Sequence, residues 1–200
     1  MKSKIIILGI LFFLLLPGVI LADIPAVERE ALIALYNATG GDNWERNDNW
    51  KTGGVFSPPG SECGWYGIRC DANHSTVIRI DLSWNNLQGT IPREIGNLNN
   101  LESLSLRFSP LTGSIPPEIG NLANLTHLNL SFNELTGTIP PEIGDLTNLR
   151  TLTFWGNQLT GTIPPELGNL SNIETLQLCS NQLTGTIPTE LSNLSSATKI

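Results

Sequence analysis

The chain has 200 residues, of which 40% are hydrophobic and 14% charged, and its 11 basic and 18 acidic side chains give a formal net charge of −7. An acidic chain is repelled by nucleic acid, so nucleic acid is not an expected partner. The chain contains two histidines and three cysteines, and it lacks the serine-hydrolase, zinc-protease, phosphate-loop and dinucleotide-binding motifs. We therefore expect no catalytic residues, no cofactor and no metal site.

The first 22 residues have the pattern of a secretory signal peptide. A basic start at Lys2 and Lys4 precedes an apolar run over residues 5–16, and Ala22 is a small residue at the expected cleavage site. The alternative is an uncleaved membrane anchor, because apolar residues continue almost to that site. We expect cleavage, and hence a secreted, extracellular protein or one held at the cell surface.

Residues 23–76 are expected to form an N-terminal cap. Apolar residues recur there at the spacing of one helical face, at Val27, Ala31, Leu35 and Ala38. This spacing predicts a helix over residues 25–38 that stops at the two glycines which follow. The apolar side of the helix would cover the open end of the repeats that come next.

Five copies of a 24-residue sequence fill residues 77–196, and a truncated sixth copy begins at residues 197–200. Each copy approximates L-x-x-L-x-L-x-x-N-x-L-x-G-x-I-P-x-E-I/L-G-N-L-x-x, and its seven inward positions hold only Leu, Ile, Val or Phe. A period in the twenties with this leucine spacing indicates a solenoid of stacked turns. The x-L-x-L-x stretch alternates with period two, so each turn should add one strand to a parallel sheet.

An asparagine column follows the strands, at Asn85, Asn133, Asn157 and Asn181. A buried amide at this place can bond to backbone groups that are left open where the chain turns. The second copy instead has Ser109 followed by Pro110. We therefore predict a weak point in the solenoid at the second turn.

Two motifs carry a resemblance to a known family. The stretch that begins at Leu135 reads L-T-G-T-I-P-P-E-I-G, and near copies begin at Leu87, Leu111, Leu159 and Leu183. Upstream, C-G-W-Y-G-I-R-C at Cys63–Cys70 is similar to the N-terminal cap motif C-x-W-x-G-V-x-C. Both motifs resemble those of the plant-type leucine-rich repeat family.

The resemblance implies an α/β solenoid, namely a right-handed leucine-rich repeat superhelix. Its parallel β-sheet would lie on the concave face, with 3-10 or extended segments on the convex face and a helical cap at the N-terminus. The family includes receptor ectodomains, co-receptors and polygalacturonase-inhibiting proteins. It therefore implies recognition, without naming the ligand.

The cysteines are interpreted in the light of export and of this resemblance. Cys63 and Cys70 are expected to form a disulfide, because two cysteines without a histidine cluster are too few for the alternative, a metal site. Cys179 is left over, and we expect a small, partly buried side chain, with an intermolecular disulfide or a reactive thiol as the alternative. Three tryptophans are expected to pack inside the cap: Trp44, Trp50 and Trp65.

The outward strand positions differ between copies, and a repeat scaffold would carry recognition there. The candidate ligand-binding residues are Arg79, Asp81, Trp84, Ser105, Arg107, Phe108, His127, Asn129, Phe132, Thr153, Trp155 and Gln177. Three of the aromatic residues share one column, and Trp155 is offset by one position. Exposed aromatics beside arginine are typical anchors of protein interfaces; the alternative is that the rings only shield the sheet.

Two further patterns recur with the repeat. Six N-x-S/T sequons are candidate glycosylation sites in a eukaryotic host: Asn37, Asn73, Asn124, Asn129, Asn169 and Asn193. A row of glutamates precedes the E-I-G turns, at Glu94, Glu118, Glu142, Glu166 and Glu190. We interpret these glutamates as solvated acids at helical N-termini, rather than as catalytic pairs or calcium ligands.

Two functions fit the sequence. The first is a secreted, non-catalytic recognition module that binds a protein, a peptide or a cell-wall polysaccharide through its concave or flanking face. The alternative is a structural or adhesive segment of a longer surface or receptor protein. Because the sixth copy is incomplete, we expect an open apolar end that is covered either by further turns or by self-association.

Overall fold

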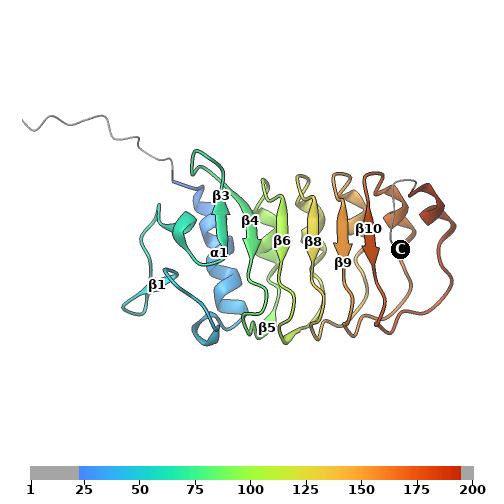
Figure 1. Cartoon of the computed structure of the whole chain (residues 1–200), viewed down its shortest axis with the longest axis horizontal. Helices are drawn as coiled ribbons and strands as arrows, with labels where there is room; N and C mark the ends of the chain where they lie inside the picture. Colours follow the sequence, from blue (N-terminus) through green and yellow to red (C-terminus); the bar gives the residue numbers. More distant parts are fainter. Residues whose placement is uncertain (1–22, 195–200) are drawn as a thin grey trace, which may run out of the picture.

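The structure is a computed structural model that describes residues 23–194. The predicted signal peptide and the start of the sixth repeat lie outside the described residues. From the cap to the fifth repeat, the described chain forms a single row of stacked turns (Figure 1).

The main sheet has six strands in the order β10-β9-β8-β6-β4-β3. Its strands are β3 (Ile68–Cys70), β4 (Val77–Asp81), β6 (Ser103–Ser105), β8 (His127–Asn129), β9 (Thr151–Thr153) and β10 (Thr175–Gln177). Neighbours are parallel except β3 and β4, which are antiparallel. The parallel register joins equivalent residues of successive copies, such as Ser103 with His127 and His127 with Thr151. Each inward side chain therefore lies beside its equivalent in the next turn.

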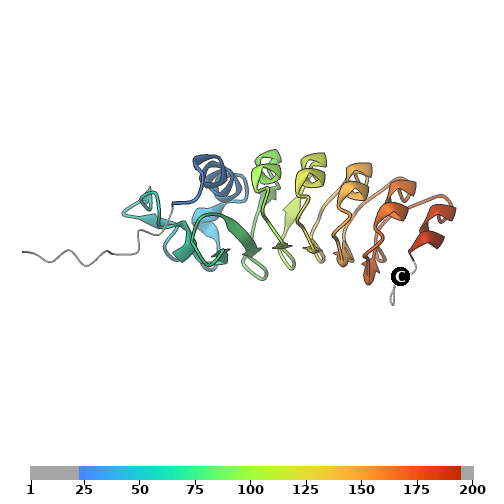
Figure 2. The same cartoon turned by 90° about the horizontal axis from the view of Figure 1, so that it is seen from above.

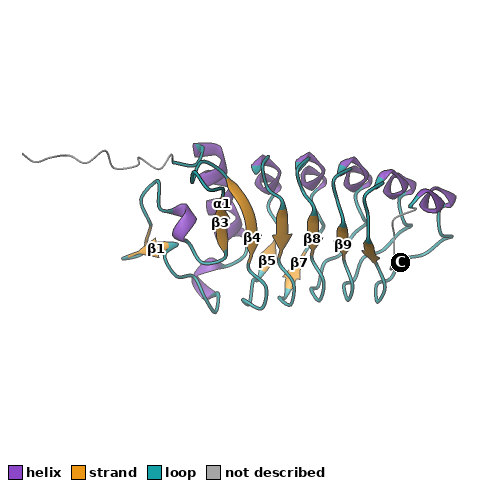
Figure 3. Cartoon of the chain, turned by 45° about the horizontal axis from the view of Figure 1, so that its top comes forward, coloured by secondary structure: helices purple, strands orange, loops and turns teal. Residues whose placement is uncertain are grey.

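Each repeat returns through an extended segment and a 3-10 helix. The extended segments β5 (Gly89–Thr90) and β7 (Leu111–Thr112) pair in parallel, and the same hydrogen bonds continue as far as Thr184 N–H to Gly161 O at 2.8 Å. The helices are η3 (Arg93–Asn97), η4 (Pro117–Asn121), η5 (Pro141–Asp145), η6 (Pro165–Asn169) and η7 (Thr189–Asn193). They form a row on the face opposite the main sheet (Figure 3). This is the solenoid architecture that the resemblance implied.

The core is a continuous apolar column between the two faces. Every predicted inward residue of the first three repeats is buried. The exceptions lie in the last two repeats, where Ile163, Leu178 and Leu183 are partly buried and Ile187 is 73% exposed. These side chains line a groove of about 230 Å³ at the C-terminal end of the described residues. Burial thus declines towards the last described turn, although Ile173, Leu176, Leu191 and Leu194 of that turn remain buried.

The helix α1 (Ala26–Ala38) continues the row of 3-10 helices at the N-terminal end (Figure 2) and packs against η3. The predicted helical cap is confirmed, but Val27 was wrongly placed on its buried face and is 46% exposed. Glu28 turns inward instead. Its carboxylate accepts hydrogen bonds from the Thr76 hydroxyl at 2.6 Å and from the Val77 N–H at 2.7 Å. These bonds satisfy polar groups at the start of the first repeat.

The rest of the cap is built around aromatic rings. Its short elements are η1 (Gly41–Asn43), β1 (Lys51–Thr52), β2 (Val55–Phe56) and η2 (Glu62–Gly64). The three predicted tryptophans are buried, and the expected disulfide joins Cys63 to Cys70. The disulfide ties η2 to strand β3, and so fixes the strand that begins the main sheet.

The asparagine column connects successive turns. Nδ2 of Asn133 donates to the carbonyl oxygens of Leu106 and Leu130, at 3.0 and 2.9 Å. The same arrangement recurs at Asn157 and Asn181. Asn85 instead bonds to the main chain of Arg46 in the cap, at 2.6 and 2.8 Å.

Candidate functional site

The outward side chains of the main sheet form rows that cross the strands. Because register partners are equivalent residues, one row contains Arg79, Ser103, His127 and Thr151, and the row beside it begins with Asp81 and Ser105. Strand β3 adds Arg69 to the first row, directly opposite Arg79. The residues that vary most between repeats are thereby brought onto one surface.

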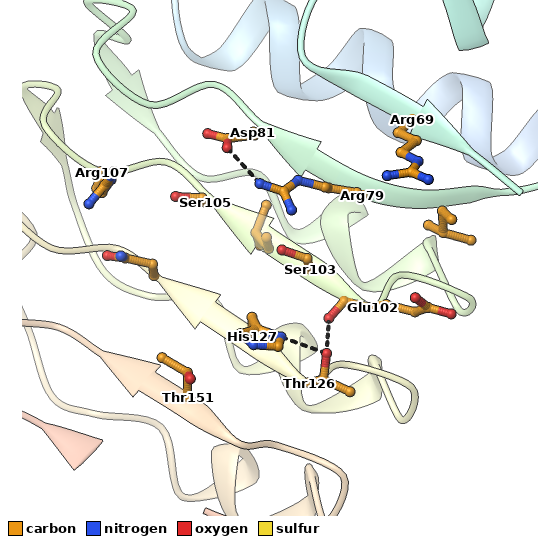
Figure 4. Close-up of a pocket in the computed structure, with 13 residues that line it drawn as sticks. Arg69, Arg79, Asp81, Glu102, Ser103, Ser105, Arg107, Thr126, His127 and Thr151 are labelled. Carbon is orange, nitrogen blue, oxygen red and sulfur yellow. Dashed lines mark hydrogen bonds and ion pairs between the residues drawn. The ribbon is translucent and has the colours of Figure 1, made fainter. Parts of the chain in front are cut away.

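A hollow of about 560 Å³ lies over this surface, between β3 and β9 (Figure 4). We call it the sheet hollow. Three arginines line it, Arg69, Arg79 and Arg107, together with short hydroxyl side chains. Six of the predicted ligand-binding residues line the hollow: Arg79, Asp81, Ser105, Arg107, His127 and Asn129.

Asp81 organises one side of the sheet hollow. Its carboxylate accepts hydrogen bonds from the Arg79 guanidinium at 3.0 Å and from the Ser83 hydroxyl at 2.7 Å. Partial burial opposes ionisation, but the hydrogen bonds from Ser83 and Arg79 outweigh it and hold the pKa of Asp81 below its usual value. Asp81 is therefore an anion near neutral pH, and it orients Arg79 along the sheet.

Arg69 and Arg107 are less constrained than Arg79. Both are exposed, and neither has an ion-pair partner within residues 23–194. The Arg107 guanidinium carbon lies 5.6 Å from the ring centroid of Phe108. Arg69 was not among the predicted site residues. The alternation Ile68-Arg69-Cys70 is the only sequence signal that would have placed it outward.

His127 is held in one orientation at the floor of the sheet hollow (Figure 4). Its Nδ1 lies 2.8 Å from the Thr126 hydroxyl, which is also 2.8 Å from the Glu102 carbonyl oxygen. The single hydroxyl proton is donated to that carbonyl, so Nδ1 of His127 is the donor in the other contact. The other ring nitrogen, Nε2, has no hydrogen-bond partner among residues 23–194.

The aromatic residues stack beside the hollow rather than inside it. Ring centroids are 3.6 Å apart for Trp84 and Phe108, 4.3 Å for Phe108 and Phe132, and 4.7 Å for Phe132 and Trp155. Trp155, which is offset in sequence, contacts the last of the three stacked rings at an interplanar angle of 54°. The first three rings lie on residues with φ of 59°, 57° and 56°, a conformation that side-chain-bearing residues rarely adopt. A second groove of about 460 Å³ runs along these rings.

Three residues at predicted outward positions either differ from the prediction or lie away from the sheet hollow. Thr153 is buried, because its short side chain lies between its longer register partners Asn129 and Gln177. Gln177 is half-buried on β10 and does not line the hollow. Cys179 is exposed rather than partly buried, and it lines the apolar groove at the last turn.

The remaining polar patterns lie on other surfaces. Five of the six sequon asparagines are exposed, and Asn124 donates from its side chain to the Asn99 carbonyl oxygen at 3.0 Å. The glutamate row lies in the first turns of the 3-10 helices. Within residues 23–194, no group of three or more His, Cys, Asp and Glu is placed to hold a metal ion. No helix in that range is both long and apolar enough to cross a membrane.

A family model described as a leucine-rich repeat region matches residues 78–199, more than half of the chain. The chain belongs to the leucine-rich repeat family. One curated relative, the LRR receptor-like serine/threonine-protein kinase FEI 2 of Arabidopsis thaliana, is 38% identical to this leucine-rich repeat protein over 54 residues. That match covers 26% of the chain and 9% of the kinase. The chain thus spans about a tenth of the length of this relative.

Several solved structures are similar over most of this leucine-rich repeat chain. A plant ice-binding protein is 33% identical with a TM-score of 0.72, covering 88% of this chain and 57% of that one. A chain of the BIR3–SERK2 complex of Arabidopsis thaliana is 32% identical with a TM-score of 0.73, and the match covers 84% of this chain and 90% of that one. The plant peptide hormone receptor RGFR1, in complex with RGF2, is 41% identical with a TM-score of 0.60, and the match covers 60% of this chain and 19% of that one.

Proposed function

We propose that this leucine-rich repeat protein is an extracellular, non-catalytic recognition module that binds a protein or peptide on the outward face of its main sheet. The observation that carries the proposal is the contrast between the two sides of each strand. The inward positions repeat the same apolar residues, whereas the outward positions change from turn to turn. Sequence variation confined to one face is what a recognition scaffold requires.

The relatives support this assignment. The BIR3–SERK2 structure is a complex of two proteins, and RGFR1 binds the peptide RGF2. A hollow that is lined by polar side chains suits a peptide better than it suits a flat adhesive contact. This favours recognition over the alternative of a purely structural segment.

The test is a selection of displayed peptides on the secreted protein, followed by binding measurements on two tyrosine variants. Ser103→Tyr fills the centre of the sheet hollow, while Glu142→Tyr places the same ring on the exposed first turn of η5. We expect the selected peptides to lose binding to Ser103→Tyr and to keep it with Glu142→Tyr. Peptides that bind both variants equally would contradict the proposal.

A second candidate, binding to an ice surface, is favoured by a different surface. Exposed threonines form two rows along the extended return segments. One row is Thr112, Thr136, Thr160 and Thr184, and the other is Thr90, Thr138, Thr162 and Thr186, with Ser114 in place of a threonine between Thr90 and Thr138. Neighbouring segments in a sheet are about 4.8 Å apart, so hydroxyl and methyl groups recur at a fixed spacing. Such an array can meet a crystalline surface at many points, and a plant ice-binding protein is among the similar structures.

Growth of ice crystals in the presence of the protein tests this second candidate. Thr138→Tyr breaks the middle of one threonine row, and Glu142→Tyr is the matched control on the helical face. An ice-binding protein should inhibit recrystallisation and lose the effect in Thr138→Tyr only. Ordinary crystal growth with the unmodified protein would exclude this function.

A further inference from the structure

We propose that the sheet hollow binds an extended peptide through its acidic side chains, with Arg69, Arg79 and Arg107 as the carboxylate-binding residues. This inference rests on the proposed recognition function and names the class of peptide. It begins from charge: the whole chain is acidic, yet three of its 11 basic residues line one hollow. The three arginines outnumber the two carboxylates of the hollow, Asp81 and Glu102, so this part of an acidic protein carries a local excess of positive charge that attracts anions.

The pairing of Arg69 with Arg79 is the strongest single observation. The two residues are directly opposite each other in the antiparallel pair β3–β4. Like charges directly opposite each other in a sheet are destabilising. Asp81 neutralises only one side of Arg79, at 3.0 Å. A ligand carboxylate between the two guanidinium groups would relieve the repulsion and accept bonds from both.

Arg107 supplies a second anchor point. It lies on the next strand-to-turn segment, beyond Ser105, and its guanidinium is exposed without an ion-pair partner among the described residues. The Phe108 ring beside it restricts the guanidinium from one side. One acidic side chain opposite Arg69 and Arg79 and a second one opposite Arg107 would then fix both the position and the direction of the peptide.

The rest of the lining fits a peptide backbone. Ser103, Thr151 and Asn129 offer hydroxyl and amide groups, and His127 offers its second ring nitrogen to a polar partner. The row from β3 to β9 crosses four strand spacings, which is about 19 Å, or roughly six residues of extended peptide. The hollow is therefore long enough for a short peptide segment.

A polyuronate is the competing anionic ligand, and the hollow disfavours it. Asp81 and Glu102 also line the hollow, and they would repel a chain that carries a carboxylate on every sugar. A peptide can place its acids opposite the arginines and neutral residues elsewhere. The aromatic rings, which would suit the faces of sugar rings, line the other groove.

The experiment measures binding of a fluorescent peptide of alternating glutamate and glycine, about six residues long, by fluorescence anisotropy. The same peptide with glutamine and an oligogalacturonate of equal charge are the comparison ligands. We expect the glutamate peptide to bind about tenfold more tightly than the glutamine peptide, and more weakly as salt is added. Equal binding of the two peptides, or tighter binding of the oligogalacturonate, would overturn the proposal.

Arginine variants locate the site. Arg69→Gln and Arg107→Gln should each weaken binding about tenfold, whereas Arg93→Gln, an exposed arginine on η3, should leave it unchanged. Arg69→Gln should also keep or raise the melting temperature, because it removes the opposed like charge. A residue with a merely structural role would lower the melting temperature and leave binding unchanged.

The failure of this inference is distinguishable from the failure of the proposed function. If Ser103→Tyr abolishes binding of the selected peptides but Arg69→Gln and Arg107→Gln leave it unchanged, the carboxylate site is refuted and the recognition function is retained. If Ser103→Tyr also leaves peptide binding unchanged, both the carboxylate site and the recognition function are refuted.

Discussion

Nδ2 of Asn133 lies 3.0 Å from the carbonyl oxygen of Leu106, which belongs to the preceding turn. The Oδ1 atom of the same amide accepts a hydrogen bond from the Leu111 N–H at 3.4 Å. One side chain thus joins two turns where the backbone leaves the main sheet. Because no single turn can bury its own apolar residues, the solenoid depends on such links between neighbours.

The second repeat lacks this link, and we expect Ser109→Asn to restore it. Ser109 is buried, and its hydroxyl has no hydrogen-bond partner among the described residues. The new amide should raise the free energy of unfolding by about 1–2 kcal/mol, measured by urea denaturation. Pro110→Glu alone is the control and should change stability less. An unchanged or lower stability of Ser109→Asn would show that the turn does not accept an amide there.

Asn85→Ala should loosen the cap from the repeats. The Asn85 side chain is buried and exchanges two hydrogen bonds with the main chain of Arg46, at 2.6 and 2.8 Å. Its removal leaves both main-chain groups unsatisfied, which should cost about 2–4 kcal/mol. Hydrogen exchange should then speed up at cap amides. Asn181→Ala, at the other end of the column, should leave those amides protected; equal effects of the two variants on the cap would contradict this account.

Sequence reasoning succeeded where the environment of a residue repeats. Leu104 and Leu128 occupy equivalent positions, so the 24-residue period alone places both in the core. Sequence reasoning failed where a contact occurs only once in the chain. The burial of Thr153 depends on the length of its two neighbours, and the exposure of Val27 follows from the inward turn of Glu28. Arg69 lies at the sheet hollow because the cap strand β3 pairs antiparallel with β4, and the repeat pattern does not predict this pairing.

Gly161→Ala should destabilise the threonine-bearing return segments. Gly161 has φ of +77°, and an added Cβ would lie 2.9 Å from Cγ2 of Thr138 in the preceding turn. Both the backbone strain and the close contact oppose any side chain, so we expect a loss of about 1–3 kcal/mol. Gly64→Ala is the matched control, since its added Cβ would meet open space and its φ is not positive. Thermal unfolding of the two variants should differ clearly; similar melting temperatures would refute the steric argument.

Tyr36 should make the cap sensitive to alkali. Burial, reinforced by the hydrogen bond to Asp42 at 2.8 Å and the charge of that carboxylate, raises the pKa of Tyr36 from 10.0 to about 12. The folded protein therefore keeps a proton that the unfolded chain loses between these values. Stability from this group is fully present below pH 10 and declines as the pH rises towards about 12.

The comparison of Tyr36→Phe with the unmodified protein isolates this effect. Lysines other than Lys51 act on both proteins equally. Lys51 binds the same Asp42 oxygen as Tyr36 and lies over the Tyr36 ring, so the difference between the unfolding free energies reports Tyr36 together with this contact. At neutral pH the variant should be less stable, because it loses the hydrogen bond to Asp42. The gap should narrow as the pH rises from 10.0 to about 12. A gap that stays constant over this interval would mean that Tyr36 ionises at its ordinary pKa.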